Sequence, residues 1–226
     1  MSQRAFRGAL FDLDGTLVDS APDLVGTLND MRCDRGLAVM PYRQLRSHAT
    51  RGALGLLGVG FSELSAADRE EMRVEFIERY RERLWRDSAP FAGIESVLDR
   101  LISAGVRLGI VTNKIESLAR PLVEQAGWHH IFGTIIGGDS TPRSKPDPGP
   151  VLTACSALGL SPAECIFVGD DQRDVQAGKA AGTATIAVNW GYIEPADQPT
   201  AWGADHVVDQ VEQLTHFFDL DPSAKR

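Results

Sequence analysis

Short apolar runs of strand length alternate with segments of helical periodicity from Phe91 into the C-terminal part of the chain. The expected strands cover residues 106–111, 133–136, 165–168, 185–188 and 205–208. The expected helices cover 97–101, 117–125, 151–158 and 174–181. Alternating strands and helices imply parallel pairing with right-handed crossovers. The chain is therefore predicted to be an α/β protein with a doubly wound parallel sheet.

The segment that follows the first expected strand, over 5–11, contains helical patterns only. Ser20 or Asp19 is expected to cap a helix soon after that strand. Between 41 and 87 no strand pattern occurs, and apolar side chains recur every four residues after a cap signal at Ser65. They are Met72, Phe76, Tyr80 and Leu84. This part of the chain is predicted to be a helical insertion.

The charge balance limits the partners of the chain. With 226 residues, of which 43% are apolar, it is long enough to bury a substantial core. Its 31 acidic and 23 basic residues give a formal charge of −8, and Lys and Arg form no cluster of five or more. A nucleic-acid partner is therefore not expected. A phosphate ester bound by such an acidic chain needs a metal ion or a local lysine.

Neither a membrane partner nor a disulfide framework is expected. Asp12 ends the apolar run 8–11 before it reaches membrane or secretory length, which favours a cytoplasmic protein. Cys33, Cys155 and Cys165 are odd in number and lack C-x-x-C spacing. We expect all three to be buried as small apolar side chains. The oligomeric state is left open.

The stretch FDLDGTLVDS places three carboxylates directly after the apolar run of the first strand. Ionised carboxylates in low-dielectric surroundings are costly unless a cation or hydrogen-bond donors compensate them. Asp12 and Asp14 are two residues apart, so their side chains leave an extended segment on the same side, and Gly15 permits a sharp turn. Such a pair suits a nucleophile and a general acid/base, and with Asp170 it suits Mg²⁺ binding.

Further polar side chains stand at the carboxyl ends of the later strands, where ligands bind to doubly wound sheets. Thr112 and Asn113 offer a hydroxyl and an amide to a phosphoryl group, although alone they fit a strand that ends in an Asn turn better. Lys145 stands in the stiff loop SKPDPGP, where its charge can neutralise phosphate oxygens. VGDDQRD holds three carboxylates that repel one another unless a cation joins them. They are Asp170, Asp171 and Asp174.

In chain order, D-x-D-G-T-L-V-D-S, T-N, K-P-D-P and G-D-D-x-x-D resemble the four motifs of the phosphatases of the haloacid dehalogenase superfamily. The resemblance extends from Asp12 to Asp174. It implies a Rossmann-like catalytic core over residues 1–18 and 88–226 and a helical cap domain over 19–87. It also implies Mg²⁺ as the cofactor.

The same resemblance implies roles for single residues. Asp12 is the implied nucleophile and Asp14 the implied acid/base, while Asp12, Asp170 and the main-chain carbonyl of Asp14 are the implied Mg²⁺ ligands. The residues expected at the phosphoryl group are Thr112, Asn113 and Lys145. In the implied mechanism Asp12 attacks phosphorus while Asp14 protonates the leaving oxygen, and Asp14 then activates water to hydrolyse the aspartyl-phosphate.

Within the superfamily, TLVDSAPDL and KPDPGPVL resemble the phosphoglycolate phosphatase group most. MRCDRGL and GYIEPADQPTAWGADHVVD resemble the N-acetylmuramic acid 6-phosphate phosphatases of cell-wall recycling. Asp171 also matches that second group better, since glycolate phosphatases usually have Ser there. The expected partner is a small phosphorylated metabolite, with N-acetylmuramic acid 6-phosphate placed before 2-phosphoglycolate.

His48 and Arg51, in RSHATRGALG, lie where caps of this family present a specificity loop. Arg51 is a candidate for a substrate carboxylate, which a guanidinium can bind through two parallel hydrogen bonds. A solvated loop residue is an equal alternative for Arg51.

Three competing functions stay open at this point. A 2-haloacid dehalogenase is disfavoured because that group lacks the second aspartate of the first motif, Asp14. A phosphosugar mutase would keep every motif. A non-catalytic binding protein is disfavoured by the intact motif set.

Overall fold

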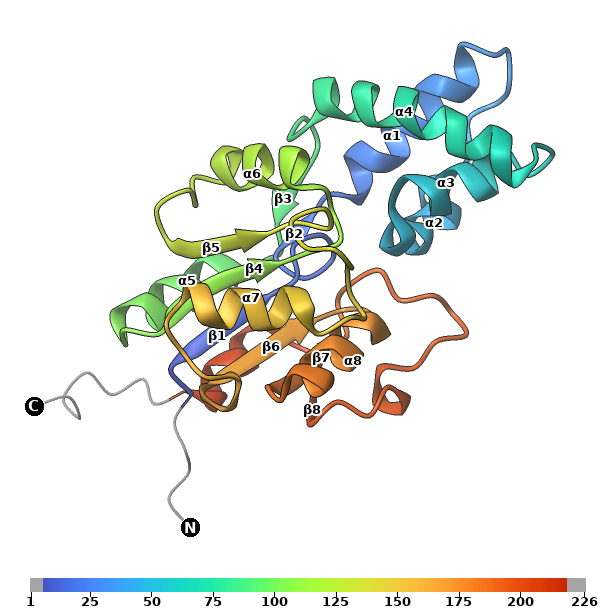
Figure 1. Cartoon of the computed structure of the whole chain (residues 1–226). Helices are drawn as coiled ribbons and strands as arrows, with labels where there is room; N and C mark the ends of the chain where they lie inside the picture. Colours follow the sequence, from blue (N-terminus) through green and yellow to red (C-terminus); the bar gives the residue numbers. More distant parts are fainter. Residues whose placement is uncertain (1–5, 219–226) are drawn as a thin grey trace, which may run out of the picture.

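The computed structural model describes residues 6–218, and its core is a six-stranded parallel sheet (Figure 1). The strands are β1 (Gly8–Phe11), β4 (Arg107–Val111), β5 (Phe132–Ile136), β6 (Cys165–Gly169), β7 (Ala184–Val188) and β8 (His206–Val208). They lie in the order β5-β4-β1-β6-β7-β8, so the direction of winding reverses between β5 and β6. This order confirms the predicted doubly wound α/β fold. It also places the carboxyl ends of β1, β4 and β6 side by side, where such folds bind ligands.

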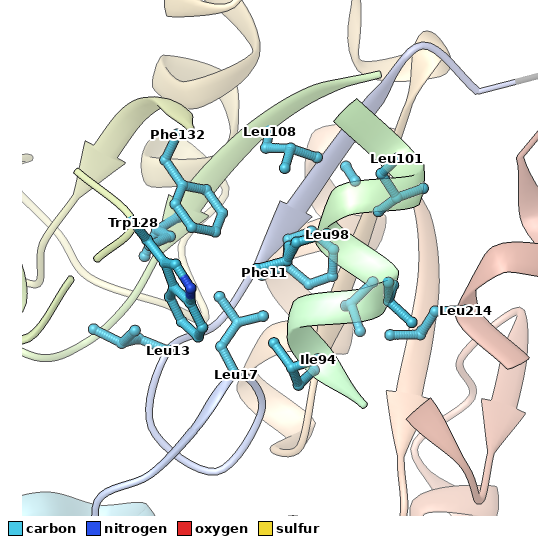
Figure 2. Close-up of a cluster of buried hydrophobic side chains, with 14 of the residues drawn as sticks. Phe11, Leu13, Leu17, Ile94, Leu98, Leu101, Leu108, Trp128, Phe132 and Leu214 are labelled. Atoms are coloured by element: carbon cyan, nitrogen blue, oxygen red, sulfur yellow. The ribbon is translucent and has the colours of Figure 1, made fainter. Parts of the chain in front are cut away.

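Helices cover both faces of the sheet. Successive side chains of a strand point to opposite faces, so each strand contributes apolar side chains to both. Phe11 of β1 and Leu108 of β4 belong to the apolar cluster on one face, which Figure 2 shows in part. Leu10 of β1 and Phe167 of β6 belong to the cluster on the other face. The first face is covered by α5 (Ile94–Ser103), α6 (Glu116–Gln125) and the 3₁₀ helix η4 (Val211–Phe217), and the second by α7 (Gly149–Ala157) and α8 (Gln172–Ala181). Burial on both faces explains the continuous apolar runs of the strands.

A layer of helices lies beyond the ends of the strands to which the arrows point (Figure 1). It consists of α1 (Ala21–Cys33), α2 (Tyr42–Leu45), the 3₁₀ helix η1 (Arg46–Arg51), α3 (Gly52–Gly60) and α4 (Ala66–Arg83). Leu28, Leu56 and Phe76 are buried in an apolar cluster within this layer. As predicted, Ser65 begins α4 with a capping box, in which Asp68 is the reciprocal partner.

The helical layer is joined to the sheet through a short antiparallel pair of strands. They are β2 (Val18–Asp19) and β3 (Ala89–Pro90). The pair lies where the chain enters and leaves the helical layer. The division into a core over 1–18 and 88–226 and a cap domain over 19–87 agrees with this position and stays a prediction. No helix in the described range is long and apolar enough to cross a membrane.

Two local predictions are wrong. The side chain of Ser20 makes no cap hydrogen bond at α1; instead the hydroxyl of Tyr192 accepts the N–H groups of Ser20 and Ala21, at 2.7 and 2.9 Å. Cys33 is exposed, whereas Cys155 and Cys165 are buried as expected. A separation of two residues turns a helix by about 200°, so Cys33 points away from the buried Met31. Residue 5 of the first expected strand lies outside the described residues.

Candidate active site

The loop after β1 carries Asp12 close to the sheet. Its Oδ1 atom accepts a hydrogen bond from the N–H of Leu13 at 2.8 Å and lies 2.9 Å from Nζ of Lys145. Gly15 has φ = 83°, and a Cβ atom there would lie 2.2 Å from Oδ2 of Asp170. Glycine is therefore required for this loop to approach the loop after β6.

Asp14 lies in a network that links the sheet to the helical layer. Nζ of Lys114 is 3.0 Å from each of its carboxylate oxygens, and the hydroxyl of Ser20 donates to Oδ1. The same Nζ is 3.1 Å from the hydroxyl of Tyr80 on α4. Burial lowers the pKa of Lys114, but Asp14 and Tyr80 outweigh burial, so this pKa is raised and the ammonium stays charged. Burial raises the pKa of Tyr80 to about 12, so its hydroxyl stays neutral.

Lys145 is buried where the loop after β5 meets the sheet. Its Nζ lies 2.9 Å from Oδ1 of Asp12, 2.7 Å from Oδ1 of Asp174 and 2.8 Å from the carbonyl oxygen of Val111. Burial lowers the pKa of Lys145, and the two carboxylates outweigh that effect and raise it. Its charge is therefore fixed between two acidic side chains.

Asn113 and Thr112 hold the loops around this lysine. The Asn113 carboxamide donates to the carbonyl oxygen of Lys145 and accepts from its N–H, both at 3.0 Å. The buried Thr112 accepts the N–H of Lys114 on Oγ1 at 3.2 Å. The structure thus uses the Asn113 amide to position Lys145. Direct contact of Thr112 or Asn113 with a phosphoryl group stays a prediction.

Three carboxylates of the site lie close together. Ligand oxygens of Asp12, Asp170 and Asp174 lie within 4.8 Å of one another. Asp170 is 2% exposed, and its hydrogen-bond donors within residues 6–218 are neutral: the hydroxyl of Thr16 at 2.8 Å and the N–H of Tyr192 at 2.9 Å. Burial, followed by repulsion from Asp12 and Asp174, raises the pKa of Asp170 well above its usual value.

This cluster offers the oxygen ligands that a hard divalent cation binds. Asp12 and Asp174 share Lys145, but within residues 6–218 no Lys, Arg or His forms an ion pair with Asp170. A buried carboxylate without a counter-charge is costly, and carboxylate oxygens are the ligands that Mg²⁺ prefers. The structure therefore brings together the predicted metal ligands Asp12 and Asp170, and adds Asp174. A ligand role for the Asp14 carbonyl stays a prediction.

Asp171 does not belong to this cluster. It caps α8, and its carboxylate pairs with Arg173 at 2.7 Å. Burial raises the pKa of Asp171, but the hydrogen bonds and charge of Arg173 prevail and lower it to about 2. The hydroxyl of Thr50, from η1, donates to the same carboxylate at 2.7 Å.

A pocket of about 330 Å³ opens above these side chains, between the sheet and the helical layer. Its polar floor includes Asp12, Asp14, Thr112, Lys114, Lys145 and Asp174. Its apolar wall comes from α1, α3, α4 and α6 and includes Leu24, Ala53, Phe76, Ile77 and Leu118. An acidic floor with buried lysines beneath an apolar wall suits a ligand that has one anionic end and one larger, less charged end.

Arg51 lies at the rim of the pocket, 63% exposed in its side chain, with Nη2 2.8 Å from Oε1 of Glu194. His48 is 3.9 Å from the same oxygen. Arg73, which the sequence did not single out, also lines the pocket, and its Nε atom is 2.7 Å from Glu70. The structure thus places Arg51 at the pocket with its charge already paired.

Sequence reasoning assigned no role to several residues of the site. Lys114 directly follows the T-N pair at the carboxyl end of a strand, and that position was the available signal. Tyr80 was predicted only as an apolar helix position, and Tyr192 was not predicted to belong to the site. Their contacts with Lys114 and with the start of α1 join segments far apart in the chain. No local pattern indicates such contacts.

Comparison with known proteins agrees with this geometry. Residues 9–188 match the family model of haloacid dehalogenase-like hydrolases. A phosphoglycolate phosphatase of Xanthomonas campestris pv. campestris is 44% identical over 208 residues, which are 92% of this chain and 94% of the relative. An N-acetylmuramic acid 6-phosphate phosphatase of Pseudomonas aeruginosa is 39% identical over 220 residues, 97% of each chain. The crystal structure of a predicted phosphoglycolate phosphatase from Haemophilus somnus matches with a TM-score of 0.82 at 30% identity, over 95% of this chain and 97% of that one.

The chain therefore belongs to the haloacid dehalogenase-like hydrolases. Within that family it is a phosphatase, as its homologues and structural neighbours are. The predicted superfamily and the predicted class of activity are both confirmed.

Proposed function

We propose that this phosphatase is a Mg²⁺-dependent phosphomonoester hydrolase that forms an aspartyl-phosphate on Asp12, and that its substrate is N-acetylmuramic acid 6-phosphate in the cytoplasm. The observation that carries the proposal is the state of Asp12. Its Oδ1 atom is held by Leu13 and Lys145, whereas Oδ2 has no hydrogen-bond partner among residues 6–218. A nucleophile needs such a combination of fixed orientation and one free oxygen.

Asp12, Asp170 and Asp174 would hold Mg²⁺ at the acidic cluster. The bound ion would neutralise charge on the phosphoryl oxygens and on the carboxylates around them. This assignment accounts for Asp170, whose buried carboxylate otherwise has no ion-pair partner in the described part of the chain.

The chain's own residues supply the remaining chemistry. The Asp12 carboxylate forms a bond to phosphorus while the bond from phosphorus to the ester oxygen breaks, and Lys145 and Thr112 bind the phosphoryl oxygens. Asp14 gives a proton to the departing oxygen. Asp14 then takes a proton from the water that attacks the aspartyl-phosphate, which releases phosphate and restores Asp12. Lys114 and Ser20 hold the Asp14 carboxylate in place for both transfers.

We assign the helical layer over 19–87 to a cap domain that recognises the leaving group. The core motifs face only the phosphoryl group, so discrimination among leaving groups must come from the pocket wall. A pocket of about 330 Å³ matches the volumes that enclose ligands much larger than a two-carbon acid. Its size and apolar wall support a substituted sugar, and Arg51 is the proposed partner for the lactyl carboxylate.

Hydrolysis of 2-phosphoglycolate is the second candidate, because relatives 44% identical over most of the chain carry that name. Purified protein should be assayed with Mg²⁺ against N-acetylmuramic acid 6-phosphate, 2-phosphoglycolate and glucosamine 6-phosphate. We expect the highest kcat/KM with the muramic ester. Acid quenching followed by mass spectrometry should find phosphate on the peptide that contains Asp12. A higher kcat/KM with phosphoglycolate would make the muramic assignment wrong, and phosphate on another residue would exclude the Asp12 mechanism.

A further inference from the structure

The 3₁₀ helix η1 is fastened to the loops of the sheet at both of its ends. At the start, the guanidinium of Arg46 donates to the carbonyl oxygens of Gly191 at 2.7 Å and Trp190 at 3.1 Å. At the end, Thr50 contacts the loop after β6. The segment that forms one wall of the pocket is thus held by the core, not only by the helical layer.

Thr50 meets two residues that follow β6, Asp171 at the N-cap of α8 and Arg173 in the first turn of α8. Its hydroxyl donates to Oδ2 of Asp171 at 2.7 Å, and its carbonyl oxygen accepts from Nη2 of Arg173 at 2.7 Å. Asp171 and Arg173 are themselves joined by two parallel bonds, Nε to Oδ1 at 2.7 Å and Nη2 to Oδ2 at 2.8 Å. The pair offers one acceptor and one donor, and Thr50 supplies the matching donor and acceptor.

The two oxygens of Asp171 are fully used by these contacts. Oδ1 accepts hydrogen bonds from the main-chain N–H and from Nε of Arg173. Oδ2 accepts hydrogen bonds from Nη2 of Arg173 and from the hydroxyl of Thr50. Its neighbour Asp170, by contrast, faces the acidic cluster. Asp171 therefore takes part in the contact with Thr50 and not in the acidic cluster, although it is adjacent to Asp170 in the chain.

We propose that Asp171 and Arg173 form a latch for Thr50, and that this latch makes Asp171 a positioning residue for leaving-group recognition. The latch fixes the turn that carries Arg51 and the start of α3 over the pocket. The consequence for catalysis rests on the proposed phosphatase function. The contact itself does not, so it can be measured without substrate.

Two near-isosteric variants separate the contact from its surroundings. Thr50→Val removes the hydroxyl donor, and Asp171→Asn removes the charge of its acceptor. Thr153→Val is the matched control, because the Thr153 side chain is exposed and its hydroxyl donates within α7, to the carbonyl oxygen of Gly149. The first readout is hydrogen exchange of the main-chain amides of residues 46–54. We expect faster exchange there in Thr50→Val and in Asp171→Asn, with α7 unchanged and the control like the wild type.

The second readout is the ratio of kcat/KM for N-acetylmuramic acid 6-phosphate to that for acetyl phosphate, whose small leaving group does not reach the wall. Loss of a hydrogen bond to a charged group predicts about a 10-fold fall in this ratio for Thr50→Val, chiefly through KM. The double variant should lose little more than Asp171→Asn, because the two residues act as a unit. Unchanged exchange over 46–54 in both variants, or equal loss with both substrates, would overturn the latch. A wild type that hydrolyses neither substrate would refute the proposed function alone, because the exchange comparison still decides the contact.

Discussion

Nζ of Lys114 lies 3.0 Å from both carboxylate oxygens of Asp14, which makes a lysine the fixed partner of the proposed acid/base. The lysine comes from the loop after β4 and the aspartate from the loop after β1. The hydroxyl of Tyr80, on α4, completes the contact at 3.1 Å. The orientation of Asp14 thus depends on both layers of the molecule.

Lys114→Met should weaken hydrolysis of sugar phosphates by about 100-fold in kcat, the scale of a general acid/base contribution. The loss should be much smaller for 2,4-dinitrophenyl phosphate, since that phenolate leaves without a proton. Steady-state kinetics with both esters checks this. Tyr80→Phe is the control that removes only the hydroxyl, and it should lose less than Lys114→Met. Equal losses for the two esters would show that Lys114 does not act through Asp14.

Asp12→Asn should leave the fold intact and reduce kcat by roughly 10⁴-fold or more, as loss of the central group of a catalytic unit does. An amide is a poor nucleophile, whereas it can still accept the N–H of Leu13. Asp99→Asn, at an exposed position of α5, is the matched control. Circular dichroism and activity should be measured together. Turnover by the Asp12 variant beyond the level that deamidation supplies would falsify the nucleophile assignment.

Asp170→Asn should stabilise the metal-free protein and remove most of the stabilisation that Mg²⁺ gives. In the metal-free protein it removes a carboxyl group whose ionisation is opposed by burial and by Asp12 and Asp174, and the Thr16 hydroxyl can turn to accept from the new amide. The thermal midpoint should therefore rise by about 3 °C. Added Mg²⁺ should raise the midpoint of the wild type and have little effect on the variant. A variant that Mg²⁺ stabilises as strongly as the wild type would remove Asp170 from the metal site.

The sheet and its motif residues could be predicted because their signals are local. Each strand is a short apolar run, and a parallel order follows from its alternation with helices. The carboxyl ends of β1, β4, β5 and β6 then meet at one edge, which brings Asp12, Lys145 and Asp170 together without knowledge of any contact.

The contacts between the two layers could not be predicted in this way. Ser20 has the right residue type for a helix cap, but the competing acceptor on Asp14 takes its hydroxyl. Tyr192, from a loop after β7, supplies the cap instead. Asp171 has the pattern of a ligand in an acidic cluster, but Arg173 and Thr50 use its oxygens. In each case tertiary geometry decides between two partners that the local sequence equally allows.

The capping box before β6 should stabilise the folded protein by an amount that falls as the pH becomes acidic. The Ser161 N–H, the Ser161 hydroxyl and then Arg7 lower the pKa of Glu164 to about 2, from an ordinary value of 4.5. Because the folded pKa is the lower one, the contribution is complete above about pH 4.5 and is lost as the pH falls toward 2. The difference in unfolding free energy between wild type and Glu164→Gln should shrink over that interval. Denaturant titrations at several pH values check this, and a difference that is constant from pH 6 to pH 3 would contradict it.

Glu194 competes with a substrate carboxylate for Arg51, and this competition gives two variants of opposite effect. Arg51→Ala should lower kcat/KM for N-acetylmuramic acid 6-phosphate about 10-fold, with little change for glucosamine 6-phosphate, which lacks the carboxylate. Glu194→Gln removes the competing charge 2.8 Å from Arg51 and should lower KM for the muramic ester. Arg73→Ala is the comparison, because Arg73 also lines the pocket and, among residues 6–218, forms an ion pair only with the exposed Glu70. If the carboxylate-dependent loss appears in Arg73→Ala and not in Arg51→Ala, the guanidinium that recognises the substrate is on α4.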